Sequence, residues 1–135
     1  MDYAVLAAEL GGDPLSRGYA AMTDAEAAAD LNTLYRTRQS ERADPADAYN
    51  VIDQSEWSAL TAAQQQEIAA ILQIGTALGH LVTPGSRVRQ RFIAIFGAGS
   101  DTIAALLDLI TVDISRAEEL GLGAVKPGHV EKARA

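Results

Sequence analysis

The stretch TIAALLDL, Thr102 to Leu109, decides the fold class of this chain. Its apolar residues recur at spacings of three and four, which is the period of one face of an α-helix. The same periodicity appears in VLAAEL at 5–10, DAEAAADL at 24–31 and QEIAAIL at 66–72. Alternating apolar and polar stretches, which indicate strands, are nearly absent. The sequence therefore predicts an all-α fold.

Length and composition limit the architecture further. A chain of 135 residues, 48% of them hydrophobic, suits one domain with its own core. We therefore predict a single compact bundle of about six to eight short-to-medium helices over residues 1–135. The chain has no cysteine, which excludes disulfides, thiolate nucleophiles and cysteine metal sites.

Charge and hydropathy point away from nucleic acid and membrane. The net charge of −7 opposes general binding to phosphate backbones. The longest nearly apolar run, 68–82, contains Gln73 and His80 and is shorter than the ~20 residues that span a bilayer. The N-terminus has no basic segment, so no signal peptide is expected. We expect a soluble protein without specific nucleic-acid binding.

Capping residues place the helix starts. Thr23 with Glu26 and Thr61 with Gln64 have the spacing of a capping box. The second helix is predicted from Asp24 to about Arg36, with buried Leu31, Leu34 and Tyr35. In the N-terminal half, the other predicted helices are Tyr3–Leu10, a short helix that begins at Pro45 after Asp44, and a helix from Asp53 or Ser55 to Leu60 that places Trp57 in the core. Further along the chain, we predict helices from Ala62 to at least Ile74, from Pro84 to Phe96, and from the residue after Ser100 to at least Leu109. A tail helix follows Pro127.

No set of residues indicates catalysis. The two histidines, His80 and His129, lie far apart and outside any HxxxH or HExxH pattern. FGAGSD at 96–101 lacks the spacing of a phosphate-binding loop, and Ser100 lacks a surrounding GxSxG. Adjacent Glu118 and Glu119 point apart on a helix. We therefore predict no enzyme, no cofactor and no metal site.

Two groups of arginines leave alternatives open. In one interpretation the arginines are solvated charges beside the buried face of a helix. In the other they form a contact patch for acidic surfaces of neighbouring subunits. Residues 1–30 hold six acidic residues against Arg17, which permits head-to-tail packing of copies around a ring or an internal salt-bridge network. The candidate subunit contacts are Arg87, Arg89, Arg91, Arg36 and Arg38.

The stretch ISRAEELGLG, Ile114 to Gly123, reads as the end of a helix. Ser115 and Glu118 have capping-box spacing, although the preceding helix could also pass straight through. Gly121 suits the left-handed position that ends a helix, and Gly123 frees the chain for a turn. We interpret Gly121 and Gly123 as a hinge that directs the tail helix, 127–135, either back onto its own domain or outward to another subunit.

Four passages resemble small acidic all-α proteins of tailed bacteriophages and prophages. They are LNTLYRTRQS at 31–40, DQSEWSALTAAQQQEI at 53–68, IFGAGSDTIAALLDL at 95–109 and ISRAEELGLGAVKPGHVEKARA at 114–135. This resemblance covers about half of the chain. Proteins of this family are encoded among phage structural genes, which implies a role in the virion or its assembly and identifies no catalytic residues.

The expected function is therefore that of a non-enzymatic structural protein of a tailed phage particle. It would act in multiple copies, as a head–tail connector or another tail component, and would contact other phage structural proteins and copies of itself. We expect it in the virion after assembly in the bacterial cytoplasm. The alternative is a phage-encoded regulator or inhibitor that binds a host protein through its acidic surface.

Overall fold

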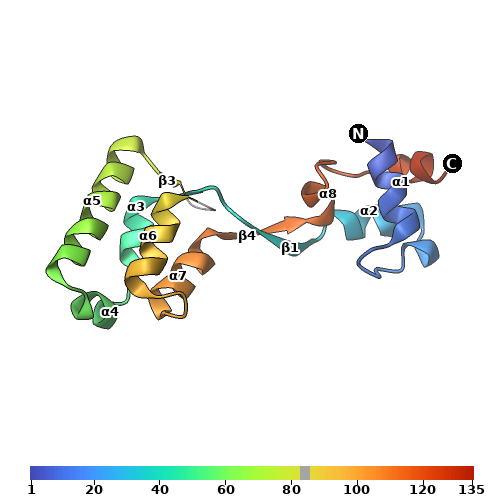
Figure 1. Cartoon of the computed structure of the whole chain (residues 1–135). Helices are drawn as coiled ribbons and strands as arrows, with labels where there is room; N and C mark the ends of the chain where they lie inside the picture. Colours follow the sequence, from blue (N-terminus) through green and yellow to red (C-terminus); the bar gives the residue numbers. More distant parts are fainter. Residues whose placement is uncertain (83–85) are drawn as a thin grey trace. The chain divides into compact units, whose positions relative to one another are not determined.

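The computed structural model describes residues 1–82 and 86–135, and α-helices dominate it (Figure 1). The described residues form nine α-helices; helical residues of all kinds make up 63% of them and strands 11%. A mostly helical fold is thus confirmed, but the finer prediction of an all-α fold is wrong. Two small two-stranded sheets, β1 with β4 and β2 with β3, make the difference.

The chain divides into two compact units. Unit 1 contains residues 1–38 and 113–135, and unit 2 contains residues 39–112. The chain leaves unit 1 within β1 and returns within β4, so unit 2 is inserted into the sequence of unit 1. Where the sequence predicted one continuous domain over 1–135, each unit has a hydrophobic core of its own.

Unit 1 is built from both ends of the chain. From the N-terminal part come α1 (Tyr3–Gly12), the 3₁₀ helix η1 (Tyr19–Ala21), α2 (Asp24–Asn32) and most of β1 (Leu34–Gln39). From the C-terminal part come most of β4 (Thr111–Ser115), α8 (Arg116–Glu119) and α9 (Pro127–Arg134).

The tail helix α9 belongs to the core of unit 1. It packs against α1 and α2, and Val130 on its inner face is fully buried together with Leu6, Leu31 and Tyr19. Arg134, near the end of the chain, donates hydrogen bonds to the backbone oxygens of Tyr19 and Met22. Of the two arrangements that the sequence left open, the structure shows the tail packed on its own unit.

Unit 2 contains the longest helix, α5. Its elements are β2 (Arg42–Ala43), α3 (Pro45–Asn50), α4 (Gln54–Ala59), α5 (Ala62–Leu78), β3 (Leu81–Val82), α6 (Arg87–Phe96) and α7 (Asp101–Ile110). The strands β2 and β3 pair antiparallel, with Arg42 opposite Val82 and Ala43 opposite Leu81. The predicted start of the sixth helix at Thr83 and Pro84 lies outside the described residues, and Ser86 caps α6.

The core of unit 2 lies between α5, α6 and α7. Ile68, Phe92 and Ile103 are buried at its centre, and Val88, Ile95 and Phe96 pack against them on the predicted face of α6. Trp57 is half-buried against the same cluster, as the sequence predicted. Gly75 of α5 lies so close to Leu81 and Pro45 that an added Cβ would be 3.2 Å from Pro45 Cγ.

Most predicted helix starts are confirmed. Both capping boxes are formed, because the Thr23 and Thr61 hydroxyls accept from the backbone N–H three residues on. The carboxylates of Asp44 and Asp53 and the hydroxyl of Ser100 cap α3, α4 and α7 in the same way. These caps are local interactions, which is why sequence spacing predicts them.

The predicted end of the second helix is wrong. The helix ends at Asn32 instead of near Arg36, and residues 34–39 form β1. Thr33, Tyr35 and Thr37 favour extended backbone, and β4 supplies a partner strand about 75 residues further along the chain. As a result, Leu34 is 63% exposed rather than buried, whereas Leu31 is buried as predicted.

Candidate functional site

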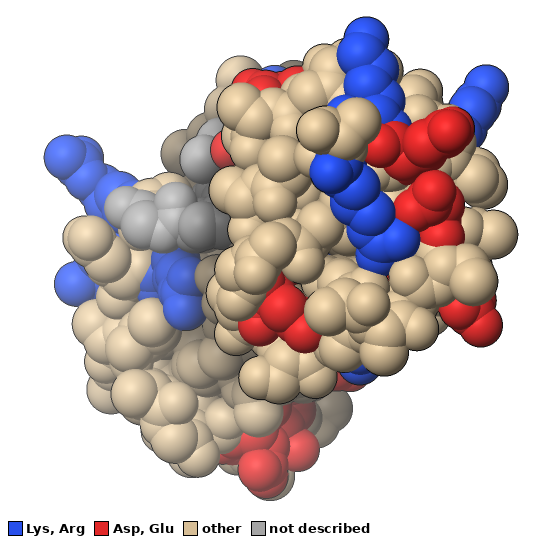
Figure 2. Space-filling view, turned by 90° about the vertical axis from the view of Figure 1, so that its right-hand side faces the viewer, with Lys and Arg blue, Asp and Glu red and all other residues tan. Residues whose placement is uncertain are grey.

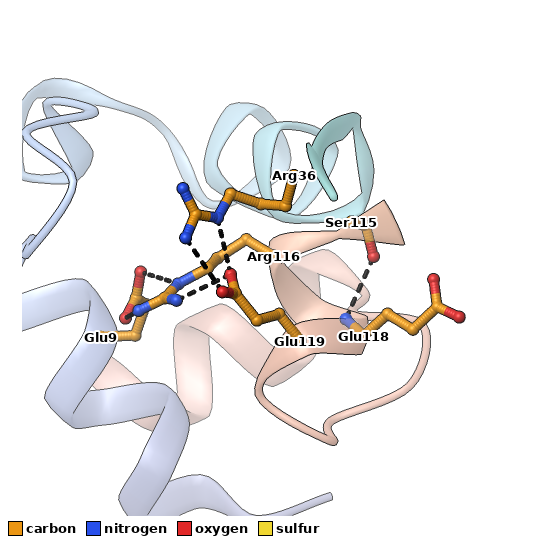
Figure 3. A network of polar contacts seen from close by, with 6 residues as sticks. All are labelled: Glu9, Arg36, Ser115, Arg116, Glu118 and Glu119. Carbon is orange, nitrogen blue, oxygen red and sulfur yellow. Dashed lines mark hydrogen bonds and ion pairs between the residues drawn. The ribbon is translucent and has the colours of Figure 1, made fainter. Parts of the chain in front are cut away.

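A network of two arginines and two glutamates joins three elements of unit 1 (Figure 3). Glu9 projects from α1, Arg116 and Glu119 from α8, and Arg36 from β1. Arg116 donates two hydrogen bonds of 2.8 Å to the Glu9 carboxylate and a third of 2.8 Å to Glu119. Arg36 donates to both oxygens of Glu119, at 2.8 and 3.0 Å. Two guanidinium groups thus neutralise two carboxylates.

Burial differs along this network. The side chain of Glu9 is 3% exposed and that of Arg116 is 13% exposed, whereas Arg36 and Glu119 reach the surface. The hydrogen bonds from Arg36 and then Arg116 lower the pKa of Glu119 to about 2. The hydrogen bond to Glu9 raises the pKa of Arg116. Arg36, Arg116 and Glu119 therefore keep their charges near neutral pH. The network is suited to holding α1, β1 and α8 together rather than to proton transfer.

We expect the stability of unit 1 to fall in acid through Glu119. Its pKa in the folded state, about 2, lies below the ordinary value of 4.5, so its contribution is complete above about pH 4.5 and is lost as the pH falls towards 2. The melting temperature of a Glu119→Gln variant should be lower than that of the parent at pH 7 and should converge with it near pH 2. Glu118→Gln is the matched control, because that neighbouring carboxylate has no ion-pair partner among the described residues; equal pH profiles for parent and Glu119→Gln would contradict the assignment.

The acidic residues of the N-terminal third are engaged within unit 1. Glu9 binds Arg116, Asp30 binds Arg17 through both oxygens, and Asp24 binds Arg134 at 2.6 Å. The other three carboxylates accept backbone N–H groups: Asp2 at the start of α1, Asp13 from Arg17 and Gly18, and Glu26 in the capping box. The structure contains the internal network, one of the two possibilities that the sequence left open, and head-to-tail contacts between copies stay a prediction.

The candidate contact arginines separate into two kinds. Arg36 and Arg91 have carboxylate partners, Arg91 through two hydrogen bonds to Glu67 at 2.6 and 2.9 Å. Arg89 donates to the neutral side chain of Gln39 at 2.7 Å. Arg38 and Arg87 are exposed and make no side-chain hydrogen bond or ion pair with the described residues. Three of the five guanidinium groups therefore have an intramolecular partner.

Arg38 lies in a polar cleft of unit 1. The cleft is lined by Thr37 and Arg38 of β1, Ile114 of β4, and Glu118 and Glu119 of α8. On the face of unit 1 that Figure 2 presents, basic and acidic side chains alternate instead of gathering into a patch of one sign. This mixed face agrees with the pairing of charges inside unit 1.

The glycines of the predicted hinge end α8. Gly121 has φ +70°, its N–H bonds the Glu118 carbonyl at 2.9 Å, and the Leu122 N–H bonds the Ala117 carbonyl at 2.8 Å. This pair of bonds is the Schellman motif, in which the residue after the left-handed position packs back on the helix. Leu122 is accordingly buried in the core of unit 1 with Ala117. The left-handed turn predicted at Gly121 is confirmed, and Gly123 follows with φ +65°; movement at this turn stays a prediction.

Replacement of Gly121 by alanine should cost unit 1 about 1 kcal/mol of unfolding free energy, because an L side chain is strained in the left-handed region. No atom lies within 4 Å of an added Cβ, so the strain is confined to the backbone. Gly128→Ala in α9 is the matched control. Its added Cβ is equally uncrowded and its φ is not left-handed, and we expect unchanged or slightly raised stability. Equal effects of the two substitutions in urea unfolding would contradict this account.

The residues considered for chemistry have structural contacts. Ser100 caps α7, and His129 Nδ1 accepts the Lys126 N–H at 3.2 Å while its ring meets Tyr3 edge-on. Among the described residues no group of three or more histidine, aspartate or glutamate side chains is placed to hold a metal ion. Over the same part of the chain, no helix is both long and apolar enough to cross a membrane.

Sequence reasoning missed the long-range polar contacts. Glu9 and Arg116 are 107 residues apart, and the Glu56 carboxylate of α4 accepts the backbone N–H groups of Asp101 and Thr102 at the start of α7. The Asn32 side chain exchanges two hydrogen bonds with the backbone of Val125. A single sequence carries no spacing signal for such pairs, because nothing local distinguishes these carboxylates from solvated ones.

Comparison with known proteins adds no assignment. The chain matches no protein-family model, no curated protein and no solved structure.

Proposed function

We propose that this protein is a non-enzymatic structural or assembly protein of a tailed bacteriophage, present in multiple copies as a head–tail connector or another tail component. The phage assignment rests on the resemblance of the four sequence passages. It implies assembly in the bacterial cytoplasm, a final location in the virion, and contacts with other phage structural proteins and with copies of the same chain.

The observation that favours protein contacts is the outer face of α5 in unit 2. Ile74 and Leu78 are one helical turn apart and are 61% and 66% exposed. The charged residue of α5, Glu67, is paired with Arg91. Large apolar side chains on a face without free charge are typical of interfaces, because charged residues are depleted at interface centres. Tyr49 of α3, 58% exposed, adds an aromatic side chain to the surface of unit 2.

Among the candidate arginines, Arg38 and Arg87 fit this role best. Both guanidinium groups are exposed and lack a side-chain partner among the described residues, so neither must break an intramolecular ion pair before it binds an acidic neighbour. Arg36, Arg89 and Arg91 would each have to give up the contacts that they make within the chain.

Mass spectrometry of purified particles tests the proposal directly, since a structural protein is present in the particle in multiple copies. The second step is a Ile74→Glu/Leu78→Glu double variant, which should fold but yield few complete particles because it places charge in the contact. Ala69→Glu is the control, because Ala69 is exposed on the opposite flank of α5. Absence from particles, early expression and capture of one host protein would overturn the proposal in favour of a regulator.

A further inference from the structure

The strands β1 and β4 form a sheet with two open edges. Each strand has one neighbour, and no third strand pairs with either in the part of the chain that the structure describes. The chain leaves unit 1 along β1 and returns along β4, so the two strands run in opposite directions. The unpaired N–H and C=O groups along such an edge are a template for a strand of another chain.

Each of these edge strands carries one charge that is exposed and unpaired. Arg38 of β1 and Asp113 of β4 are exposed, and neither makes a side-chain hydrogen bond or ion pair with the described residues. Both residues belong to unit 1. The other arginine of β1, Arg36, is already bound to Glu119. The two edges of the sheet therefore present opposite charges, positive on β1 and negative on β4.

We propose that copies of this chain associate head to tail, with the edge of β1 in one copy paired to the edge of β4 in the next. A second sheet in the same orientation continues the order β4-β1-β4-β1, and every strand then runs antiparallel to both neighbours. The pairing brings Arg38 to the strand that carries Asp113 of the next copy. Such a heterologous contact builds a ring or an open filament. The inference rests on the proposed multi-copy role and names the contact between copies.

Charge favours this pairing over the two symmetric ones. Asp113 is the central residue of β4, so a two-fold contact between β4 strands in full register would place one Asp113 opposite the other. A two-fold contact between β1 strands would bring together two strands that each carry Arg36 and Arg38. Like charges destabilise a strand pair, whereas opposite charges stabilise it. Chains of net charge −7 also repel each other, and Arg38 supplies a local cation without breaking an ion pair.

Sedimentation velocity of the full chain at concentrations up to ~1 mM tests the proposal, because a contact worth about 4 kcal/mol is half-occupied there. The parent should associate progressively and should not stop at a dimer. Arg38→Glu and Asp113→Lys should each weaken association at least about tenfold, because each places like charges across the contact. Arg87→Glu and Glu131→Lys make the same changes in net charge at exposed helix positions, and they should associate as the parent does.

An equimolar mixture of the two variants is the decisive measurement. Each variant has unpaired charges of one sign on both edges and should stay monomeric alone, whereas the mixture should recover the association of the parent. No change within one chain can produce this rescue, because each chain keeps its own substitution. Arg38→Gln and Asp113→Asn remove the charges without reversing them. They should weaken association less, and they replace the reversals if the amide spectrum shows that a reversal disturbs unit 1.

Three results would overturn the contact. They are a parent that stays monomeric up to ~1 mM, association that neither substitution weakens, and folded variants that do not associate when mixed. Association that stops at a dimer and responds to only one of the two substitutions would show a symmetric contact and would also contradict the proposal. Particles that contain the protein, together with a purified chain that stays monomeric, would uphold the phage role and refute this contact alone.

Discussion

A chain that ends at Lys126 is expected to lose the folded state of unit 1 while unit 2 remains folded. The deletion removes α9, whose Val130 is fully buried in the unit 1 core, and with it the hydrogen bonds from Arg134 to Tyr19 and Met22. Burial of a valine side chain contributes about 1.5–3 kcal/mol and a hydrogen bond from a charged group about 1.5–3 kcal/mol. A unit of roughly 60 residues has only about 3–9 kcal/mol of stability in total, so it should not survive the loss.

Tryptophan fluorescence reports on the folding of unit 2, and NMR reports on the folding of unit 1. Trp57, the only tryptophan, lies in unit 2, so its emission and its urea transition should be nearly unchanged. Backbone amide resonances of residues 1–32 should collapse to unfolded positions. The point variant Glu131→Ala is the control for α9, because Glu131 is exposed and has no side-chain partner among the described residues. Retention of the native spectrum of unit 1 in the truncated chain would contradict the cis packing of the tail.

Replacement of Arg116 by alanine should lower the unfolding free energy of unit 1 by about 3 kcal/mol. The Glu9 carboxylate, 3% exposed, would then be left in the interior without its two hydrogen bonds and without a counter-charge. Replacement of both partners, as in Glu9→Leu/Arg116→Leu, removes the buried charges together and should recover much of the loss. Urea unfolding followed by the resonances of unit 1 measures both effects.

An exposed ion pair provides the comparison. Arg91 and Glu67 make an equally well-formed pair, but their side chains are 47% and 37% exposed, so Arg91→Ala should change the stability of unit 2 little. The contrast between the two arginines separates the effect of burial from that of pairing. A similar loss for both, or a double variant as unstable as Arg116→Ala, would show that the desolvated charge is not the cause.

Local signals in the sequence predict most helix starts and none of the strands. Thr23, Asp44, Thr61 and Ser100 each accept a backbone N–H within three residues, so spacing alone locates them. The strand β1 is different. The predicted helix ran on to about Arg36, and the local preference of Tyr35 and Thr37 for extended backbone prevails only because β4 supplies a partner strand. Sheet pairing is a non-local interaction, which a single sequence does not display.

The candidate site was only partly predictable for the same reason. The sequence located five arginines and an acidic N-terminal third, but it could not assign partners to them. In the structure Arg36 binds Glu119, Arg91 binds Glu67 and Arg89 binds Gln39. Arg38 and Arg87 have no side-chain partner in the described part of the chain. Which charges face solvent depends on which elements meet, and that is a property of the tertiary fold.

By itself, the sequence determined the helical character of the chain, its caps and the left-handed turn at Gly121, because periodicity, capping and backbone sterics act over a few residues. The tertiary structure alone decided that residues 1–38 and 113–135 form one compact unit and that residues 39–112, which lie between them in the sequence, form a second. It also placed Val130 in the first core and set Arg116 against Glu9. These outcomes depend on burying surfaces that lie far apart along the chain, and the free energy of that burial belongs to the assembled fold.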